Sequence, residues 1–175
     1  TGHSLAITDG RSSGLLPRAE TTGVEAAAVV DLPGHALLPG LVNMHGHAAM
    51  SLLRGFADDL PLMPWLEQHI WPAEGAHVSA EFVADGTELA IAEMLSSGIT
   101  CFADQYFFPE IVAETAVDLG MRAVVGTPVA DFPSAWAKDI GEYLSKGSDL
   151  VHDPYADHPL ITTSLAPHST YALSD

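Results

Sequence analysis

Residues 36–47 have the sequence Ala36-Leu37-Leu38-Pro39-Gly40-Leu41-Val42-Asn43-Met44-His45-Gly46-His47. The part from Ala36 to Asn43 is almost continuously apolar, which predicts a strand buried on both faces of a parallel sheet. His45 and His47 follow at positions i and i+2, and such side chains of an extended chain project to the same face. Two imidazoles on one face can bind the same metal ion. The run therefore predicts an α/β protein with a metal site at the carboxyl end of its first parallel strand.

The position of this histidine pair carries more information than its spacing. With nine histidines among 175 residues, the number of His-X-His pairs expected by chance is about 0.5. Zinc takes imidazole nitrogens at about 2.0–2.1 Å, and barrel enzymes place their active sites at the carboxyl ends of strands. The alternative is a pair of solvent-exposed loop histidines. Five other histidines lack convergent partners and are interpreted as surface residues: His3, His35, His77, His152 and His158.

The chain after His47 alternates between strand and helix patterns. A helix from Ser79 to Ser97 is predicted by Ser79 as its N-cap, by an apolar face and by Gly98 as its stop. Further strands are expected at Ile99–Ala103, Ala123–Val129 and Leu160–Ala166, and further helices after Pro109 and over Ala135–Leu150. Repeated strand–helix–strand units predict a parallel sheet.

The segment before this alternation contains short strands and turns. Ser4–Thr8 and Ala26–Asp31 are predicted strands, and Asp9-Gly10 is a turn signal. We interpret residues 1–38 as part of a small β-sandwich domain. Residues 39–175 are then the first half, about four βα units, of a TIM-type (β/α)8 barrel, since a whole barrel takes about 250 residues. An open doubly wound sheet is the structural alternative, but the chain has no glycine-rich phosphate-binding turn.

The charge balance and the cysteine count exclude some classes of protein. Six Lys and Arg residues against 23 Asp and Glu residues give a net charge of −17. That charge repels phosphate backbones and anionic membrane surfaces, so we expect neither nucleic acid nor a membrane as a partner. Cys101 is the single cysteine, which excludes an intramolecular disulfide and a zinc ribbon and favours a cytoplasmic location.

Several separated motifs resemble those of one family. They are Pro39 to His47, Ala48 to Gly55, Trp65, Ile70 to Glu74, Ser97 to Asp104 and Ala166 to Ser169. Together they are similar to the amidohydrolase superfamily, in the branch of the 5-methylthioadenosine/S-adenosylhomocysteine deaminases and the triazine chlorohydrolases. The resemblance extends over essentially the whole chain. It departs at Gly46, where the family often has threonine, and at Gln105, where methionine is common; neither departure removes a functional side chain.

The resemblance implies a role for five side chains. His45 and His47 are then two ligands of one divalent metal ion, most simply zinc, with iron as the alternative. Glu74 accepts hydrogen bonds from the ribose hydroxyls of an adenosine-type substrate, and Trp65 lines the pocket for the purine or its sulfur substituent. His168 hydrogen-bonds the substrate near the reacting centre. Taken alone, the same residues are also compatible with a solvated carboxylate, a core tryptophan and an exposed loop histidine.

The resemblance also implies a reaction. It is hydrolytic deamination of 5′-methylthioadenosine, S-adenosylhomocysteine or adenosine by the complete enzyme, which we expect to be a homo-oligomer. The alternatives are another amidohydrolase, such as a triazine chlorohydrolase or a guanine-type deaminase, and a non-catalytic scaffold of the same fold. The remaining metal ligands and the general acid and base are expected after Asp175, so the segment alone is predicted to be inactive.

Overall fold

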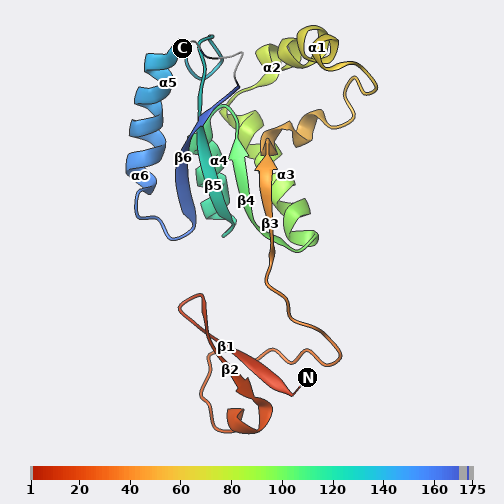
Figure 1. Cartoon of the computed structure of the whole chain (residues 1–175), viewed down its shortest axis with the longest axis vertical. Helices are drawn as coiled ribbons and strands as arrows, with labels where there is room; N and C mark the ends of the chain where they lie inside the picture. The colour runs from red at the N-terminus through yellow and green to blue at the C-terminus, as the bar shows by residue number, and fades with distance from the viewer. Residues whose placement is uncertain (1, 170–172, 174–175) are drawn as a thin grey trace. The chain divides into compact units, whose positions relative to one another are not determined.

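The computed structural model describes residues 2–169 and 173 of the chain, which Figure 1 colours along the sequence. The chain divides into two compact units between Leu38 and Pro39, and each unit has its own secondary structure. Over the described residues, no helix combines the length and the apolar character that a membrane crossing requires.

The first unit is built around one β-hairpin. Strands β1 (His3–Thr8) and β2 (Arg11–Pro17) pair antiparallel, with a register shift between Ala6 and Ile7, and a short 3₁₀ turn, η1 (Arg18–Thr21), follows. Asp9 and Gly10 have φ angles of 51° and 71°, the positive values that a two-residue type I′ hairpin turn requires. The strand predicted at Ser4–Thr8 and the turn after it are confirmed.

The second strand predicted for this unit, Ala26–Asp31, is wrong. These residues have no regular structure, and Val29 has 84% of its surface exposed. Strand propensity mostly reflects the packing of a side chain against a neighbouring strand. Among the residues that the structure describes, β1 and β2 pair only with each other, so this β-branched segment has no strand to pair with.

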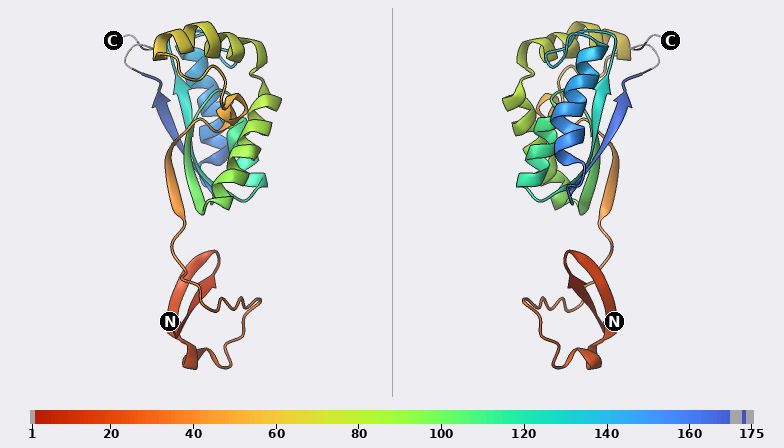
Figure 2. Two further views of the ribbon diagram at one scale, coloured as in Figure 1. Left: turned by 90° about the vertical axis from the view of Figure 1, so that its right-hand side faces the viewer. Right: turned by 90° about the vertical axis from the view of Figure 1, so that its left-hand side faces the viewer.

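The second unit contains a parallel sheet of four strands in the order β3-β4-β5-β6. The strands are β3 (Leu41–Gly46), β4 (Ile99–Gln105), β5 (Arg122–Val129) and β6 (Ile161–Pro167). The longer helices are α3 (Ala80–Ser96), α4 (Pro109–Asp118) and α5 (Ile140–Gly147), and Figure 2 shows them on one side of the sheet. The predicted α/β class with parallel strands is confirmed.

The connection from β3 to α3 consists of short helical segments. They are η2 (Ala48–Leu53), α1 (Leu62–Trp65), the π-helical turn η3 (Leu66–Ile70) and α2 (Trp71–His77). Pro61 is the N-cap residue of α1 and Pro64 lies in its first turn, where a missing N–H removes no intrahelical bond. Helix α3 begins as predicted, because the Ser79 hydroxyl accepts a hydrogen bond from the Phe82 N–H at 3.2 Å.

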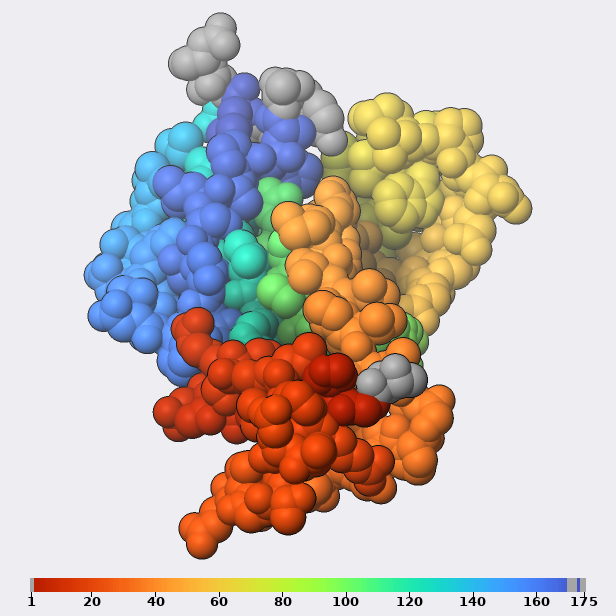
Figure 3. All heavy atoms as spheres, turned by 60° about the horizontal axis from the view of Figure 1, so that its bottom comes forward, coloured from red at the N-terminus to blue at the C-terminus, as the bar shows by residue number. Residues whose placement is uncertain are grey.

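Strand β3 differs from its prediction in position and in burial. It covers Leu41–Gly46 rather than Ala36–Asn43, so His45 lies within it and His47 directly after it. It is also not buried on both faces, because the helices cover only one face of the sheet, and Met44 has 76% of its surface exposed. In Figure 3 the strands from β3 to β6 are visible side by side on the face of the sheet that the helices leave open.

The helix predicted over Ala135–Leu150 begins later than expected. Helix α5 starts after Asp139, whose side chain accepts a hydrogen bond from the Glu142 N–H at 2.9 Å, and helical structure continues through η4 (Ser148–His152) and α6 (Asp153–Tyr155). The N-cap thus decides where the helix begins. Before it, Trp136 is buried and irregular, and its indole N–H donates to Glu110 at 3.0 Å.

An apolar core joins the helices to the sheet. It includes Val83 and Ile91 of α3, Phe102 of β4, Val112 and Ala116 of α4, and Val125 of β5. The buried face of α3 also contains Gly86. A Cβ atom at Gly86 would overlap the backbone carbonyl of Ala49 in η2. The absence of a side chain at Gly86 therefore lets η2, the turn that follows His47, lie directly on α3.

Gly86→Ala is expected to destabilise the protein. Alanine favours a helix interior over glycine by roughly 0.5–1 kcal/mol, but the overlap with Ala49 should cost about 1–3 kcal/mol. The matched control is Gly75→Ala in α2, where an added Cβ meets nothing within 4 Å and only the gain in helix propensity remains. Thermal unfolding of the full-length protein should show a lower Tm for the first variant and an equal or higher Tm for the second. A higher Tm for Gly86→Ala would contradict the close packing of η2 on α3.

Candidate metal and substrate site

Four side chains of interest gather at the carboxyl edge of the parallel sheet. β3 ends at Gly46 just before His47, β4 ends at Gln105 just before Tyr106, and β6 ends at Pro167 just before His168. Parallel strands have their carboxyl ends on one edge, which is where α/β proteins bind ligands. Glu74 reaches this edge from α2, and its carboxylate lies against Tyr106.

The imidazole rings of His45 and His47 lie next to each other. Their ring centroids are 5.1 Å apart, with the planes at 83°. An imidazole nitrogen lies about 2.0–2.1 Å from zinc, so each ring centroid of a ligating pair lies about 3.2 Å from the ion. At a tetrahedral angle two such centroids are about 5.2 Å apart. The spacing of the two rings therefore fits a shared zinc ion.

The His47 ring is fixed by the neighbouring strand. Its Nδ1 lies 2.6 Å from the backbone carbonyl oxygen of Gln105, and since a carbonyl can only accept, Nδ1 carries the proton. The lone pair is then on Nε2, where a metal can bind it, and such a hydrogen bond to the second nitrogen is the usual support of a metal-ligating histidine. The Gln105 side chain donates to the Ala166 carbonyl at 2.9 Å, so it links β4 to β6 and leaves the support of His47 to the backbone.

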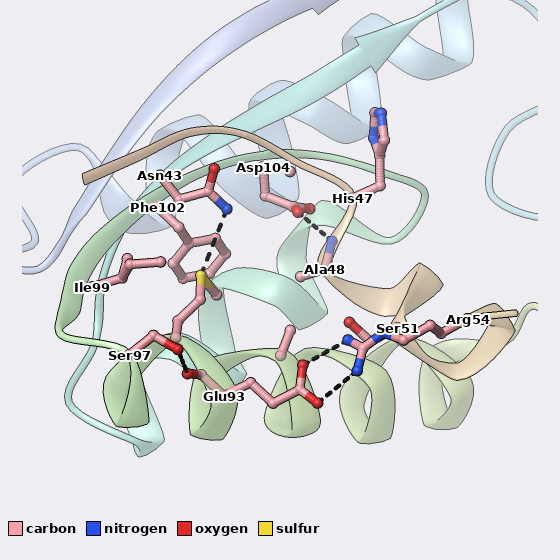
Figure 4. Close-up of a pocket in the computed structure, with 13 residues that line it drawn as sticks. Asn43, His47, Ala48, Ser51, Arg54, Glu93, Ser97, Ile99, Phe102 and Asp104 are labelled. Carbon is pink, nitrogen blue, oxygen red and sulfur yellow. Dashed lines mark hydrogen bonds and ion pairs between the residues drawn. The ribbon is translucent and has the colours of Figure 1, made fainter. Parts of the chain in front are cut away.

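Asp104 supports the same histidine from inside the protein, and the sequence analysis gave it no role. Its carboxylate is buried and accepts a hydrogen bond from the Ala48 N–H at 2.6 Å, which caps η2 directly after His47 (Figure 4). Burial raises the pKa of Asp104, the hydrogen bond from Ala48 opposes this rise, and the resulting pKa is about 7. A charged residue directly after the strand predicted at Ile99–Ala103 is the signal that could have identified it.

Glu74 is held by a residue that the sequence analysis also left without a role, Tyr106. The Tyr106 hydroxyl donates to Glu74 Oε1 at 2.7 Å. Burial raises the pKa of Glu74, whereas the hydrogen bond from Tyr106 and the interaction with His47 lower it.

His168 and Trp65 lie on two other elements. The His168 N–H donates to the Val129 carbonyl at 3.1 Å, which ties the end of β6 to β5. Burial and the interaction with His47 lower the pKa of His168. Trp65 lies in α1, and its indole N–H donates to the Phe56 carbonyl at 3.3 Å, which joins α1 to the segment before it.

A cavity of about 310 Å³ lies on the helix side of β3, between this strand, η2 and α3 (Figure 4). Its wall includes an ion pair in which Nη1 and Nη2 of Arg54 donate to the two carboxylate oxygens of Glu93, at 2.7 and 2.6 Å. Figure 4 shows the His47 imidazole pointing away from this ion pair. His47 is one of the residues that line the cavity, whereas Glu74 and His168 are not among them.

The described residues do not form a complete metal site. Within residues 2–169 and 173, no group of three or more His, Cys, Asp or Glu side chains is placed to hold an ion. The interpretation of His152 as a surface residue is wrong, because its Nδ1 lies 2.8 Å from the Thr163 hydroxyl in a partly buried position. That contact links η4 to β6 and is distant from the carboxyl edge.

Comparison with known proteins identifies related sequences. The 5-methylthioadenosine/S-adenosylhomocysteine deaminase of Saccharophagus degradans is 51% identical over 98% of this chain and 39% of its own length. The protein of the same name from Thermodesulfovibrio yellowstonii is 52% identical over 79% of this chain and 31% of its length. The 5′-deoxyadenosine deaminase of Methanococcoides burtonii is 45% identical over 77% of this chain and 30% of its own length. The chain thus spans about two fifths or less of the length of each of these relatives.

Solved structures and a family model agree with these relatives. An adenosine deaminase from Xanthomonas campestris, crystallised with bound zinc, is 49% identical and matches with a TM-score of 0.94 over 99% of this chain and 39% of its own. A guanine deaminase from C. acetobutylicum matches with a TM-score of 0.79 but only 18% identity, which shows the fold alone. The amidohydrolase family model matches residues 36–175. The chain therefore belongs to the amidohydrolase family.

Proposed function

We propose that the full-length protein is a zinc-dependent enzyme that hydrolytically deaminates 5′-methylthioadenosine, S-adenosylhomocysteine or adenosine. The observation that carries the proposal is the spacing of the His45 and His47 rings, with the Nδ1 proton of His47 held by Gln105. The relatives that are about half identical to this chain bear the names of adenosine-type deaminases. Incubation of the full-length protein with each nucleoside should release ammonia and the corresponding inosine derivative.

In this proposal, residues 39–175 form the first four βα units of a (β/α)8 barrel, and residues 1–38 contribute to a β-sandwich domain. The open face of the sheet and the exposed strand β3 are the surfaces that the rest of such a barrel would cover. We further expect the protein to be a cytoplasmic homo-oligomer that binds neither nucleic acid nor a membrane. The general acid and base and the further metal ligands then belong to the part of the protein after Asp175.

The residues of this chain have distinct tasks in the proposed reaction. His45 and His47 would hold a zinc ion, with iron as the alternative metal, and the ion supplies Lewis-acid activation of the attacking water. Glu74 would bind and orient the sugar through its carboxylate, and His168 would donate to or accept from the base near the reacting carbon. Trp65 would exclude water from one side of the pocket. Addition of water and loss of ammonia convert the amino-substituted carbon into a carbonyl.

Glu74 is the residue that favours a nucleoside over a triazine or a guanine as the substrate. A carboxylate that is partly buried and already held by Tyr106 is a costly feature for a pocket that takes an uncharged aromatic ring alone. It is suited to a ligand that brings hydroxyl donors. A non-catalytic scaffold of the same fold would have no use for the supported His47 ring, and metal analysis of the full-length protein separates that alternative.

His45→Ala in the full-length protein is expected to abolish metal retention and deamination together. Loss of outer-shell partners of a metal typically weakens its binding 10- to 100-fold, so loss of a ligand should weaken it by more than about 100-fold. Metal content after dialysis against a chelator and the rate of ammonia release are the two measurements. The control is His35→Ala, whose Nδ1 only contacts the nearby Pro33 carbonyl. Full metal content and a near-normal rate in the His45 variant would show that it is not a ligand.

Glu74→Ala is expected to discriminate between nucleosides with and without sugar hydroxyls. A hydrogen bond to a charged group contributes about 1.5–3 kcal/mol, so losing two of them should lower kcat/KM for 5′-methylthioadenosine on the order of 10²-fold or more. The 2′,3′-dideoxy analogue lacks these bonds from the start and should lose little on mutation, which completes a double-mutant cycle. Equal losses for the two substrates would show that Glu74 acts on the fold and not on the ribose.

A further inference from the structure

Glu74 and Tyr106 have very different surroundings, although they share a hydrogen bond. Glu74 lies on α2, a seven-residue helix with no fully buried residue, and its side chain has several rotatable bonds. Tyr106 is 7% exposed, belongs to the apolar core next to the sheet and packs against Phe107 with ring centroids 5.3 Å apart. The tyrosine is therefore the fixed partner of the pair, and the glutamate is the partner that it holds.

The hydrogen bond occupies only part of the carboxylate. An ionised carboxylate has two oxygens with about four lone-pair positions, and the Tyr106 hydroxyl uses one position on Oε1 at 2.7 Å. The other positions can accept from two neighbouring hydroxyl groups of a sugar. Burial and the nearby Glu74 raise the pKa of Tyr106, so the phenol stays protonated and remains a donor. Its hydrogen bond in turn favours the ionised form of Glu74.

We propose that Tyr106 is a positioning residue for nucleoside specificity, whose hydroxyl fixes the Glu74 carboxylate in the orientation that accepts hydrogen bonds from the two sugar hydroxyls. The proposal rests on the proposed function, because it assigns the reason for which Glu74 is held. A bound sugar gains most from a carboxylate that is already oriented, since no side-chain freedom is then lost on binding. Tyr106 touches no substrate atom in this scheme and acts entirely through Glu74.

The competing explanation is that Tyr106 only fills the core at the end of β4. The ring fills that space and the hydroxyl makes the bond, so Tyr106→Phe separates the two tasks. The variant keeps the packing on Phe107 and removes the donor to Glu74. Tyr143→Phe is the matched control, because Tyr143 is a buried tyrosine on α5 that packs on Trp136 and has no contact with Glu74.

The first measurement is steady-state deamination by the zinc-loaded, full-length protein. Tyr106→Phe should lower kcat/KM for 5′-methylthioadenosine about 10-fold. The loss should appear mainly in KM, because the variant keeps the Glu74 carboxylate and loses only the hydrogen bond that orients it. The loss for the 2′,3′-dideoxy analogue should be less than about twofold. In a Glu74→Ala background, Tyr106→Phe should have no further effect on either substrate. Tyr143→Phe should leave the ratio of the two substrates unchanged.

Equal losses for the two substrates, or an undiminished loss in the Glu74→Ala background, would overturn the positioning role. The second measurement does not need turnover: calorimetric binding of 5′-methylthioinosine and of its 2′,3′-dideoxy counterpart to wild type and to Tyr106→Phe. A selective loss for the hydroxyl-bearing ligand supports the role even if the wild type deaminates no nucleoside, in which case only the proposed reaction fails. Equal binding of that ligand by both proteins would overturn the role even in an active deaminase.

Discussion

The parallel pairing of β3 with β4 determines where every candidate ligand lies. Gly46 is the register partner of Asp104, and this one alignment brings His47 beside the end of β4. From there the Gln105 carbonyl binds Nδ1 of the His47 ring, and the Asp104 carboxylate binds the N–H of the next residue, Ala48. The register of the two strands shifts between Leu41 and Val42 and again between Asn43 and Gly46, so the position of His45 depends on this irregular pairing. The position of the candidate metal ligands therefore depends on the alignment of β3 with β4.

The two hydrogen bonds from β4 have different tasks because they act on different parts of the chain. The bond to the ring selects the tautomer with its lone pair on Nε2. The bond to Ala48 fixes the backbone, because it caps η2, and η2 is in turn packed on α3 at Gly86. In the wall of the cavity, the Arg54–Glu93 ion pair joins the end of η2 to α3 again, although an exposed pair of this kind adds little to stability. The backbone after His47 is thus held from the sheet and from the helix layer.

The sequence predicted the features that depend on short spacing, and it missed those that depend on pairing between distant segments. The His45–His47 pair, the Ser79 cap and the strands β4 to β6 are all encoded within a few neighbouring residues. Asp104 and Ala48 are 56 residues apart, and Tyr106 and Glu74 are 32 apart, so no local pattern could connect them. The same limit explains the wrong predictions. The apolar runs at Ala26–Asp31 and Ala36–Asn43 have strand-forming residues, but only a partner strand and a covering layer decide pairing and burial.

Gly46 lies between the two histidines, where its conformational freedom opposes a fixed separation of the imidazole rings. Glycine loses more conformational freedom on folding than any other residue, and it stands at the point where both imidazoles must keep a fixed separation. Each side of Gly46 has its own restraint: the Asn43 side chain accepts from the His45 N–H at 3.2 Å, and Asp104 accepts from the Ala48 N–H at 2.6 Å. A Cβ at position 46 would lie 3.1 Å from the Ala103 carbonyl oxygen, so the strands approach closely there. The close approach lets Asp104 and Gln105 reach across to the residues after Gly46. The two hydrogen bonds on either side of Gly46 therefore restrain the backbone that carries the imidazoles, where the residue between them adds no restraint of its own.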